Sequence, residues 1–333
     1  MRIVIATGIY PPEVGGPAYY AVDLADALKR SGCSIRVITY GWLKKLPTGL
    51  RHIVYGFKLL STAFSADVVI ALDTFSVAVP AAIVCHIVRV PLIIRTGGDF
   101  LWEAYVERTR DLVPFPFFYE KPRMLSFRER LIFKLTRFAL RGARVVFSTE
   151  MQRDLWLTPY DIDPARAHII PNAIEPPLSS EESQAQNYLW HVRLNAIKNV
   201  VHVRAAFAKA KAARPEIVLE EGIMPKARLL EGIKSCYAVM LPSVSEISPN
   251  YILDALRFHK PFIMTKYSGF AEWLGQYGIL VDPLDEADIT RAIAKIAEPA
   301  GYAEACAKAA RFSFVRTYDE VAKDFLALIQ QLV

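Results

Sequence analysis

Two acidic residues, Glu246 and Asp254, stand eight positions apart in the segment SEISPNYILD, around a Ser-Pro-Asn turn. The apolar run YAVMLPS before the segment is typical of a buried strand. Ser248 predicts a helix cap and Pro249 the first helical position, so Asp254 falls inside the helix and its side chain tilts back toward the helix start. One acid could hold sugar hydroxyls and the other ribose hydroxyls, while the N–H groups between them suit a phosphate. The alternative is a capping acid followed by a solvated helix acid.

Two cations, Arg193 and Lys198, stand five residues apart in WHVRLNAIKNVV, after the strand-like run NYLWHV. At the carboxyl end of a strand such a pair suits a diphosphate, because arginine makes bidentate contacts and lysine acts as a point charge. The alternative is a solvated pair of cations at a helix start.

Gly15 and Gly16 follow the first predicted strand, RIVIA, and precede Pro17, which is favoured as a first helical residue. Residues without side chains let backbone N–H groups come close to a phosphate, although a plain loop has the same composition. No GxGxxG follows this strand, and the second strand ends in VITY without an acid for a ribose. The pattern therefore does not favour a dinucleotide site.

Short β-rich runs alternate with helical patterns along the whole chain, which predicts an α/β protein with parallel sheets flanked by helices. Residues 171–186, PNAIEPPLSSEESQAQ, have little periodicity and three prolines, as in a linker. We expect one Rossmann-like domain over residues 1–172 and a second over residues 187–312. Residues 313–333 end in an amphipathic helix that could pack on either domain, with the N-terminal one as the candidate.

Composition narrows the class of protein. The chain has 333 residues, of which 53% are hydrophobic and 22% charged, so two globular domains are expected. Its four cysteines lack metal-binding spacing, which predicts reduced, buried thiols. The N-terminal MRIVIATGIY is typical of a strand rather than a signal peptide. The most apolar stretch, SVAVPAAIVCHIVRVPLII, is broken by prolines and cations and suits a buried helix and a strand. We therefore expect a cytoplasmic protein without a transmembrane segment.

The net charge of +6 is concentrated in two segments, WLKKLPTGLRHIVYGFKLL and KPRMLSFRERLIFKLTRFALRGAR. Basic amphipathic helices can lie on anionic membranes, where the apolar face is buried and the cations meet the headgroups. The alternative is a core-packed helix with a solvated cationic face. No nucleic-acid-binding motif accompanies these segments, so nucleic acid is not an expected partner.

Taken in order, the Gly-Gly loop, the PNAIE segment, Arg193 with Lys198, and the acid-x7-acid stretch resemble the family 4 retaining glycosyltransferases of the GT-B fold. The resemblance covers nearly the whole chain. It implies two Rossmann-like doubly wound domains with the active site in an interdomain cleft, where the loop of Gly15 and Gly16 meets the donor phosphates. It also implies transfer of a hexose-type sugar from a nucleoside diphosphate sugar to a hydroxyl of a glycan or lipid-linked acceptor.

Carried over by position, the resemblance implies that Arg193 and Lys198 bind the donor diphosphate and stabilise the departing nucleoside diphosphate. Glu246 would contact the donor sugar, and Asp254, where the family usually has glutamate, would hold the ribose. The turn between the acids would lend backbone groups to the donor; its residues are Ile247, Ser248, Pro249 and Asn250. Val192 replaces the glycine that commonly precedes the arginine.

Asp99 lies in the loop after the predicted strand PLIIRT, where many family members carry a histidine. A related branch of sugar transferases has Gly-Asp and Trp-Glu here, so the resemblance implies that Asp99 faces the donor sugar or the acceptor; a structural Asx turn is the alternative. The nominal DxD of Asp161 and Asp163 is typical of a turn, and we expect neither a metal nor another cofactor. Membrane attachment at the inner face is expected because acceptors of similar enzymes are often lipid-linked. A sugar-nucleotide epimerase or hydrolase, or a non-catalytic binding protein of the same fold, stays open as an alternative.

Overall fold

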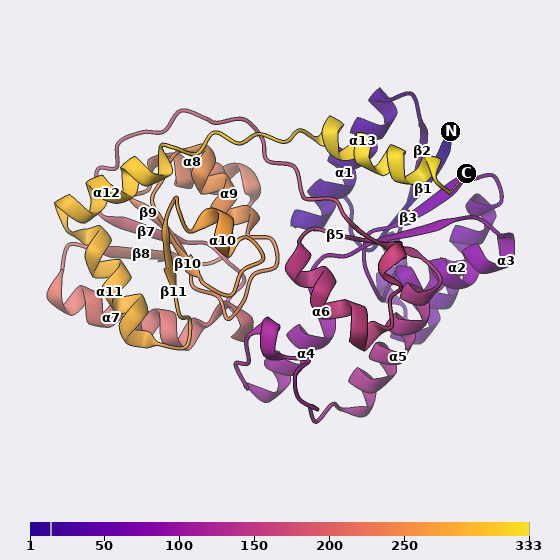
Figure 1. The fold of residues 1–333 in the computed structure, drawn as a ribbon, viewed down its shortest axis with the longest axis horizontal. Coiled ribbons are helices and arrows are strands. Elements are labelled where there is room, and N and C mark those ends of the chain that lie inside the picture. The colour runs from indigo at the N-terminus through magenta and orange to yellow at the C-terminus, as the bar shows by residue number, and fades with distance from the viewer. Residues whose placement is uncertain (14, 333) are drawn as a thin grey trace. The chain divides into compact units, whose positions relative to one another are not determined.

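The structure is a computed structural model that describes residues 1–13 and 15–332 (Figure 1). Contacts between residues divide the chain into two compact units, so that the chain passes from one unit to the other at four points. The first unit comprises Met1–Leu101, Met124–Ala173 and Thr317–Val333, and the second comprises Trp102–Arg123 and Ile174–Arg316.

The first unit contains a six-stranded parallel sheet in the order β2-β1-β3-β4-β5-β6. Its strands are β1 (Arg2–Thr7), β2 (Ser34–Thr39), β3 (Val68–Ala71), β4 (Leu92–Arg95), β5 (Arg144–Phe147) and β6 (Ala167–Ile169). The central strand β3, VVIA, is buried at every position because helices cover both faces of the sheet. The short strand β6 had no counterpart among the predicted strands.

The helices of the first unit alternate with its strands, as the sequence pattern predicted. They are α1 (Gly16–Arg30), α2 (Thr48–Ala63), α3 (Ala78–Val88), α5 (Phe127–Arg141), α6 (Glu150–Tyr160) and α13 (Tyr318–Gln330), with the short 3-10 helices η1 (Gly41–Lys45) and η3 (Pro164–Arg166). Helix α13 lies along α1, as Figure 1 shows. Phe325 of α13 is fully buried, and Arg30 forms a 2.6 Å ion pair with Asp319. The C-terminal helix thus contributes to the core of the first unit.

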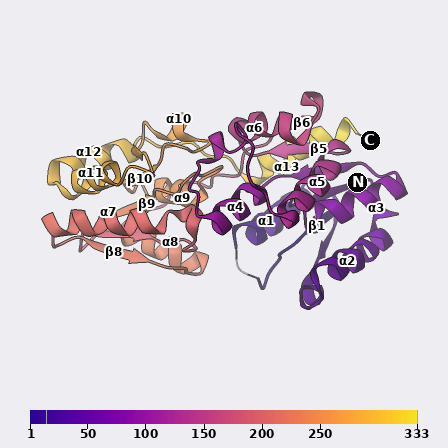
Figure 2. The same ribbon diagram turned by 90° about the horizontal axis from the view of Figure 1, so that it is seen from below.

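The second unit contains a five-stranded parallel sheet in the order β11-β10-β9-β7-β8. Its strands are β7 (Asn187–Trp190), β8 (Val218–Glu221), β9 (Ala238–Leu241), β10 (Phe262–Thr265) and β11 (Ile279–Val281). Its helices are α7 (Val200–Ala213), α8 (Lys226–Ser235), α9 (Asn250–Arg257), α10 (Ala271–Leu274), α11 (Glu286–Ala297) and α12 (Pro299–Ala309), with η2 (Phe115–Phe117) and η4 (Ala196–Lys198). Figure 2 shows α7 and α11 side by side. Two α/β units of this kind confirm the predicted fold class.

The structure differs from the predicted division at residues 102–123, which were expected in the first domain. This segment contains most of α4 (Phe100–Thr109) and the short helix η2, and it belongs to the second unit. The reason lies in its contacts: the N–H of Phe115 donates to Ser245 Oγ at 2.9 Å, and the ring of Phe117 packs edge-on against Tyr267 with centroids 5.4 Å apart. Both partners are more than 120 positions away in the sequence, so local patterns do not reveal these contacts.

Candidate active site

The loops that follow β7, β9 and β10 lie at one edge of the second sheet, because the carboxyl ends of parallel strands meet there. The first loop carries Lys198 and the second carries Glu246, and the structure joins the two side chains in an ion pair. The Lys198 side chain is 20% exposed and that of Glu246 is 12% exposed. The sequence therefore predicted two site residues that the fold brings into direct contact.

Backbone contacts fix the position of Glu246. Its N–H donates to the carbonyl of Tyr267 at 3.1 Å, and its own carbonyl accepts from the N–H of Gly269 at 2.9 Å. The loop after β9 is therefore tied to the loop after β10. The N–H of Val244 also donates to the carbonyl of Ile197 at 2.9 Å, which ties it to the loop after β7. The charged pair thus sits on three loops that hold one another in place.

Asn199 is a positioning residue that the sequence reasoning missed. It is 1% exposed and has a left-handed backbone with φ of 61°, which asparagine tolerates better than most residues. Its Nδ2 donates to the carbonyls of Pro242 at 3.1 Å and Pro283 at 2.6 Å. It therefore anchors the residue after Lys198 to the loops after β9 and β11. The position of Asn199 directly after the candidate cation Lys198 was the signal in the sequence that could have indicated this role.

Arg193 lies on the surface of the same loop. Its carbonyl accepts from the N–H of Asn195 at 2.8 Å, which turns the chain toward Lys198. Within residues 1–13 and 15–332, its guanidinium has neither a hydrogen-bond nor an ion-pair partner. An exposed guanidinium of this kind has all five N–H donors available for an anion from solution.

The predicted helix start after Glu246 needs a correction. Helix α9 begins at Asn250 with Pro249 at the cap position, and no side chain caps it, so Ser248 is not the cap. Pro249 has φ −81° and ψ 69°, and this ψ is not helical, so the helix begins one residue later than predicted. The carbonyl of Pro249 accepts from the N–H groups of Ile252 and Leu253 at 2.9 and 3.1 Å. Ile247 is buried in the turn, with 8% of its surface exposed.

Asp254 lies inside α9, as predicted, but its carboxylate is directed to Arg257 at 3.2 Å. Burial raises the pKa of Asp254 above its ordinary value, although the charges of Lys226 and Arg257 oppose the shift. Arg257 also pairs with Glu175 at 2.9 Å and donates to the carbonyl of Pro176 at 3.1 Å. The ribose-binding role of Asp254 stays a prediction.

In the first unit, the Gly-Gly turn begins a helix as expected. Gly15 is the cap residue of α1 with φ 157°, a conformation that favours glycine, and its carbonyl accepts from the N–H groups of Ala18 and Tyr19 at 3.0 and 3.2 Å. A Cβ added to Gly16 would have no neighbour within 4 Å, so this residue is open to solvent.

Asp99, also in the first unit, is fully buried and accepts a 2.8 Å hydrogen bond from Trp156 Nε1. The loop around it is fixed by Gln152, which donates to the carbonyl of Gly97 at 3.0 Å and accepts from Thr96 Oγ1 at 2.8 Å. One carboxylate oxygen is thus engaged inside the unit by a distant tryptophan. The catalytic role that the resemblance implied for Asp99 stays a prediction.

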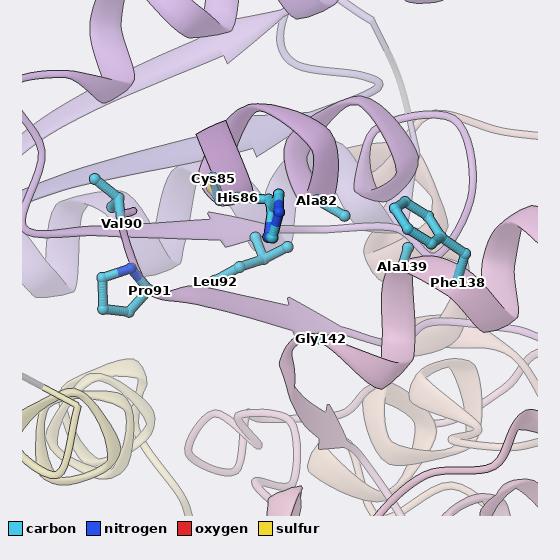
Figure 3. Close-up of a pocket in the computed structure, with 9 residues that line it drawn as sticks. All are labelled: Ala82, Cys85, His86, Val90, Pro91, Leu92, Phe138, Ala139 and Gly142. Atoms are coloured by element: carbon cyan, nitrogen blue, oxygen red, sulfur yellow. The ribbon is translucent and has the colours of Figure 1, made fainter. Parts of the chain in front are cut away.

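A separate pocket of about 240 Å³ lies between α3, β4 and α5 of the first unit. Figure 3 shows its lining, which comes from Ala82, Cys85, His86, Val90, Pro91, Leu92, Phe138, Ala139 and Gly142. His86 is the one ionisable side chain apart from the thiol of Cys85, whose pKa burial raises to about 12. The pocket contains none of the predicted site residues.

Comparison with known proteins gives the family. Residues 14–177 match the family model described as Glycosyltransferase Family 4, and residues 201–298 match the model described as Glycosyl transferases group 1. Together the two matches cover most of the chain. None of the curated protein sequences compared with the chain matches it.

Solved structures share the fold. HepE from Anabaena in complex with UDP is 14% identical with a TM-score of 0.65, covering 99% of this chain and 100% of its own. The sucrose-phosphate synthase of Thermosynechococcus elongatus is 14% identical with a TM-score of 0.73 and coverage of 100% and 99%. WaaG, a glycosyltransferase involved in lipopolysaccharide biosynthesis, is 14% identical with a TM-score of 0.68 and coverage of 98% and 99%. The two family models match successive parts of a chain that folds into two α/β units, so the chain belongs to the family 4 glycosyltransferases of the GT-B fold.

Proposed function

We propose that the protein transfers a hexose-type sugar from a nucleoside diphosphate sugar to a hydroxyl of a glycan or lipid-linked acceptor, with retention at the anomeric carbon. The observation that carries the proposal is the ion pair of Lys198 and Glu246 at the carboxyl edge of the second sheet. Ligands of doubly wound sheets bind at this edge. HepE, which has the same fold, has been solved with UDP and also with UDP and glucose, which supports a nucleotide sugar as donor.

In the proposed reaction, the bond between the anomeric carbon and the phosphate oxygen breaks while the acceptor oxygen bonds to that carbon. Negative charge grows on the leaving diphosphate, and Arg193 and Lys198 stabilise it. The acceptor proton passes to the leaving phosphate. Because the two cations supply the positive charge, we propose that no metal ion or other cofactor takes part.

The roles of the remaining donor residues form part of the same proposal. Glu246 contacts the sugar, the turn from Ile247 to Asn250 offers backbone groups, and Asp254 contacts the ribose. The Gly15 and Gly16 loop contributes N–H groups to the phosphates. The support for this division is the second sheet, whose loops after β7 and β9 carry the diphosphate and sugar residues next to each other.

The first unit supports a lipid-linked acceptor reached from an anionic membrane surface. Helix α5 exposes Phe127 by 76%, Leu131 by 47% and Phe138 by 54%, spaced so that they share one face of the helix. The exposed cations Arg128 and Lys134 accompany them, and Ser126 begins the helix with a capping box. Within residues 1–13 and 15–332, no helix is long and apolar enough to cross a bilayer. We propose that the attachment is peripheral, through the exposed apolar and basic residues of α5.

The test is incubation of the full chain with UDP-, GDP- and ADP-sugars and a panel of glycan and lipid-linked acceptors, followed by analysis of the product and its anomeric configuration. We expect transfer that depends on the acceptor and continues in the presence of a chelator. Release of free sugar or an altered nucleotide sugar without an acceptor would instead identify a hydrolase or an epimerase. Arg193→Ala should lose most of the turnover, whereas Arg291→Ala, a surface arginine of α11, should keep it.

A further inference from the structure

The segment Trp102–Arg123, called the strap here, has a compact structure of its own within the second unit. Trp102 is 2% exposed, its Nε1 donates to the carbonyl of Val113 at 2.8 Å, and its ring lies 5.6 Å from that of Phe115. Phe115 is fully buried. The strap is therefore a fixed element of the unit rather than a loose connection leading to α5.

The strap contacts the three loops at the carboxyl edge of the second sheet. Its Glu107 accepts from the N–H of Ala196 after β7 at 2.9 Å. Its Phe115 N–H donates to Ser245 after β9, and its Phe117 ring meets that of Tyr267 after β10. The loops after β7 and β9 are those to which the proposed function assigns the donor.

The Glu107 carboxylate bonds to the loop that carries both candidate diphosphate ligands. Ala196, whose N–H it accepts from, lies between Arg193 and Lys198 in the sequence. The N–H groups of Asn195 and Lys198 bond within the loop itself, whereas that of Ala196 bonds to the strap. A carboxylate oxygen on a backbone N–H occupies the same kind of position as a phosphate oxygen.

The Glu107 side chain is free to leave this position at little cost. It is 45% exposed, and its other oxygen accepts from Arg110 Nη1 at 2.8 Å, so its charge keeps a partner when the bond to Ala196 breaks. The strap itself stays anchored through the buried bond to Ser245. Only one side chain has to rotate.

We infer that Glu107 is an internal competitor of the donor diphosphate and thereby sets the affinity of the enzyme for nucleoside diphosphates. The inference rests on the proposed function. The carboxylate holds the N–H of Ala196 when no donor is bound, repels an incoming diphosphate and is displaced by it. Removal of the carboxylate therefore strengthens nucleotide binding, whereas removal of an ordinary structural contact would weaken it.

The test measures the Kd of UDP, GDP and ADP by titration calorimetry for the full wild-type chain, Glu107→Ala, Glu107→Gln and Glu120→Gln. Glu120 is an exposed acid of the same strap and controls for the general loss of one negative charge. For the nucleotide that binds, we expect Glu107→Ala to lower the Kd about fivefold, the size of one typical hydrogen bond, and Glu107→Gln to lower it less, because its amide oxygen still accepts a hydrogen bond. Glu120→Gln should leave the Kd unchanged.

Three results would overturn the inference. A Kd that stays constant or rises in Glu107→Ala, with an unchanged melting temperature, would make Glu107 a neutral or supporting contact. An equal gain in Glu120→Gln would reduce the effect to overall charge. Failure of every nucleoside diphosphate and nucleotide sugar to bind the wild-type chain would remove the proposed function itself, and the inference with it.

Discussion

Lys198 offers the sharpest test of the site, because its removal should affect stability and turnover through different mechanisms. Lys198→Met keeps the length of the side chain but leaves the Glu246 carboxylate, which is only 12% exposed, without its partner. Breaking a buried ion pair by removing one partner costs about 3–5 kcal/mol. Because both side chains keep some contact with water, we expect about 2–3 kcal/mol. For a unit of this size, the melting temperature should fall by about 5–10 °C.

Turnover should fall further than this loss of stability explains. At a temperature where the variant is still folded, loss of a group that stabilises the leaving diphosphate should lower kcat by about 10²–10³-fold. The double variant Lys198→Met with Glu246→Gln removes the uncompensated charge, so most of the stability should return while turnover stays low. Calorimetry and initial-rate assays measure the two quantities separately.

The control is Lys209→Met, which breaks a surface pair with Glu286 on the same unit. Surface ion pairs contribute little, so both the melting temperature and kcat should stay close to wild type. Full turnover in Lys198→Met, or turnover that returns together with stability in the double variant, would refute the assignment of Lys198 to the leaving group.

Three further predictions test other parts of the site. Gly16→Ala should keep the melting temperature, because the added Cβ has no neighbour in the protein, but it should raise the donor KM, because a side chain here keeps the backbone N–H groups away from the phosphates. Gly15→Ala should lower the melting temperature, because a φ of 157° does not suit alanine. The folded state holds the proton of Asp254 more tightly than the unfolded state, so wild-type stability should fall relative to Asp254→Asn as pH rises from about 4; a pH-independent difference would contradict this. Phe127→Ser should weaken flotation with anionic vesicles, while Ile223→Ser, an equally exposed residue of the second unit, should not, and no flotation of the wild type would remove the membrane proposal.

Most of the fold could be predicted from the sequence, because the patterns that indicate strands and helix starts are local. Runs such as VVIA and FIMT form strands that are buried at every position, and the Gly-Gly-Pro turn begins α1. The sequence also assigned Lys198 and Glu246 to one site, and the structure joins them. Both residues follow strands that the alternating pattern predicted, and the family resemblance assigned them to one donor site.

What the sequence did not reveal depends on contacts between distant positions. Asn199 bonds to carbonyls 43 and 84 positions away, and its role is visible only when the loops are in place. The start of α9 depends on the backbone angles of Pro249. From its residue type alone, Pro249 could occupy either the cap or the first helical position. The strap belongs to the second unit, and not to the first as predicted, because Phe115 and Phe117 contact partners in the second unit.

Arg257 gives Asp254 a structural role within the second unit. Its side chain is only 8% exposed, and its planar fork of five N–H donors serves Glu175, Asp254 and the carbonyl of Pro176. Asp254, three positions earlier on the same helix, pairs with this guanidinium at 3.2 Å. The negative charge of Glu175 in turn raises the pKa of Asp254, after the larger effect of burial. The acid of α9 and the PNAIE segment thus share one buried cation, so Asp254 takes part in anchoring that segment through Arg257 in addition to any contact with a ribose.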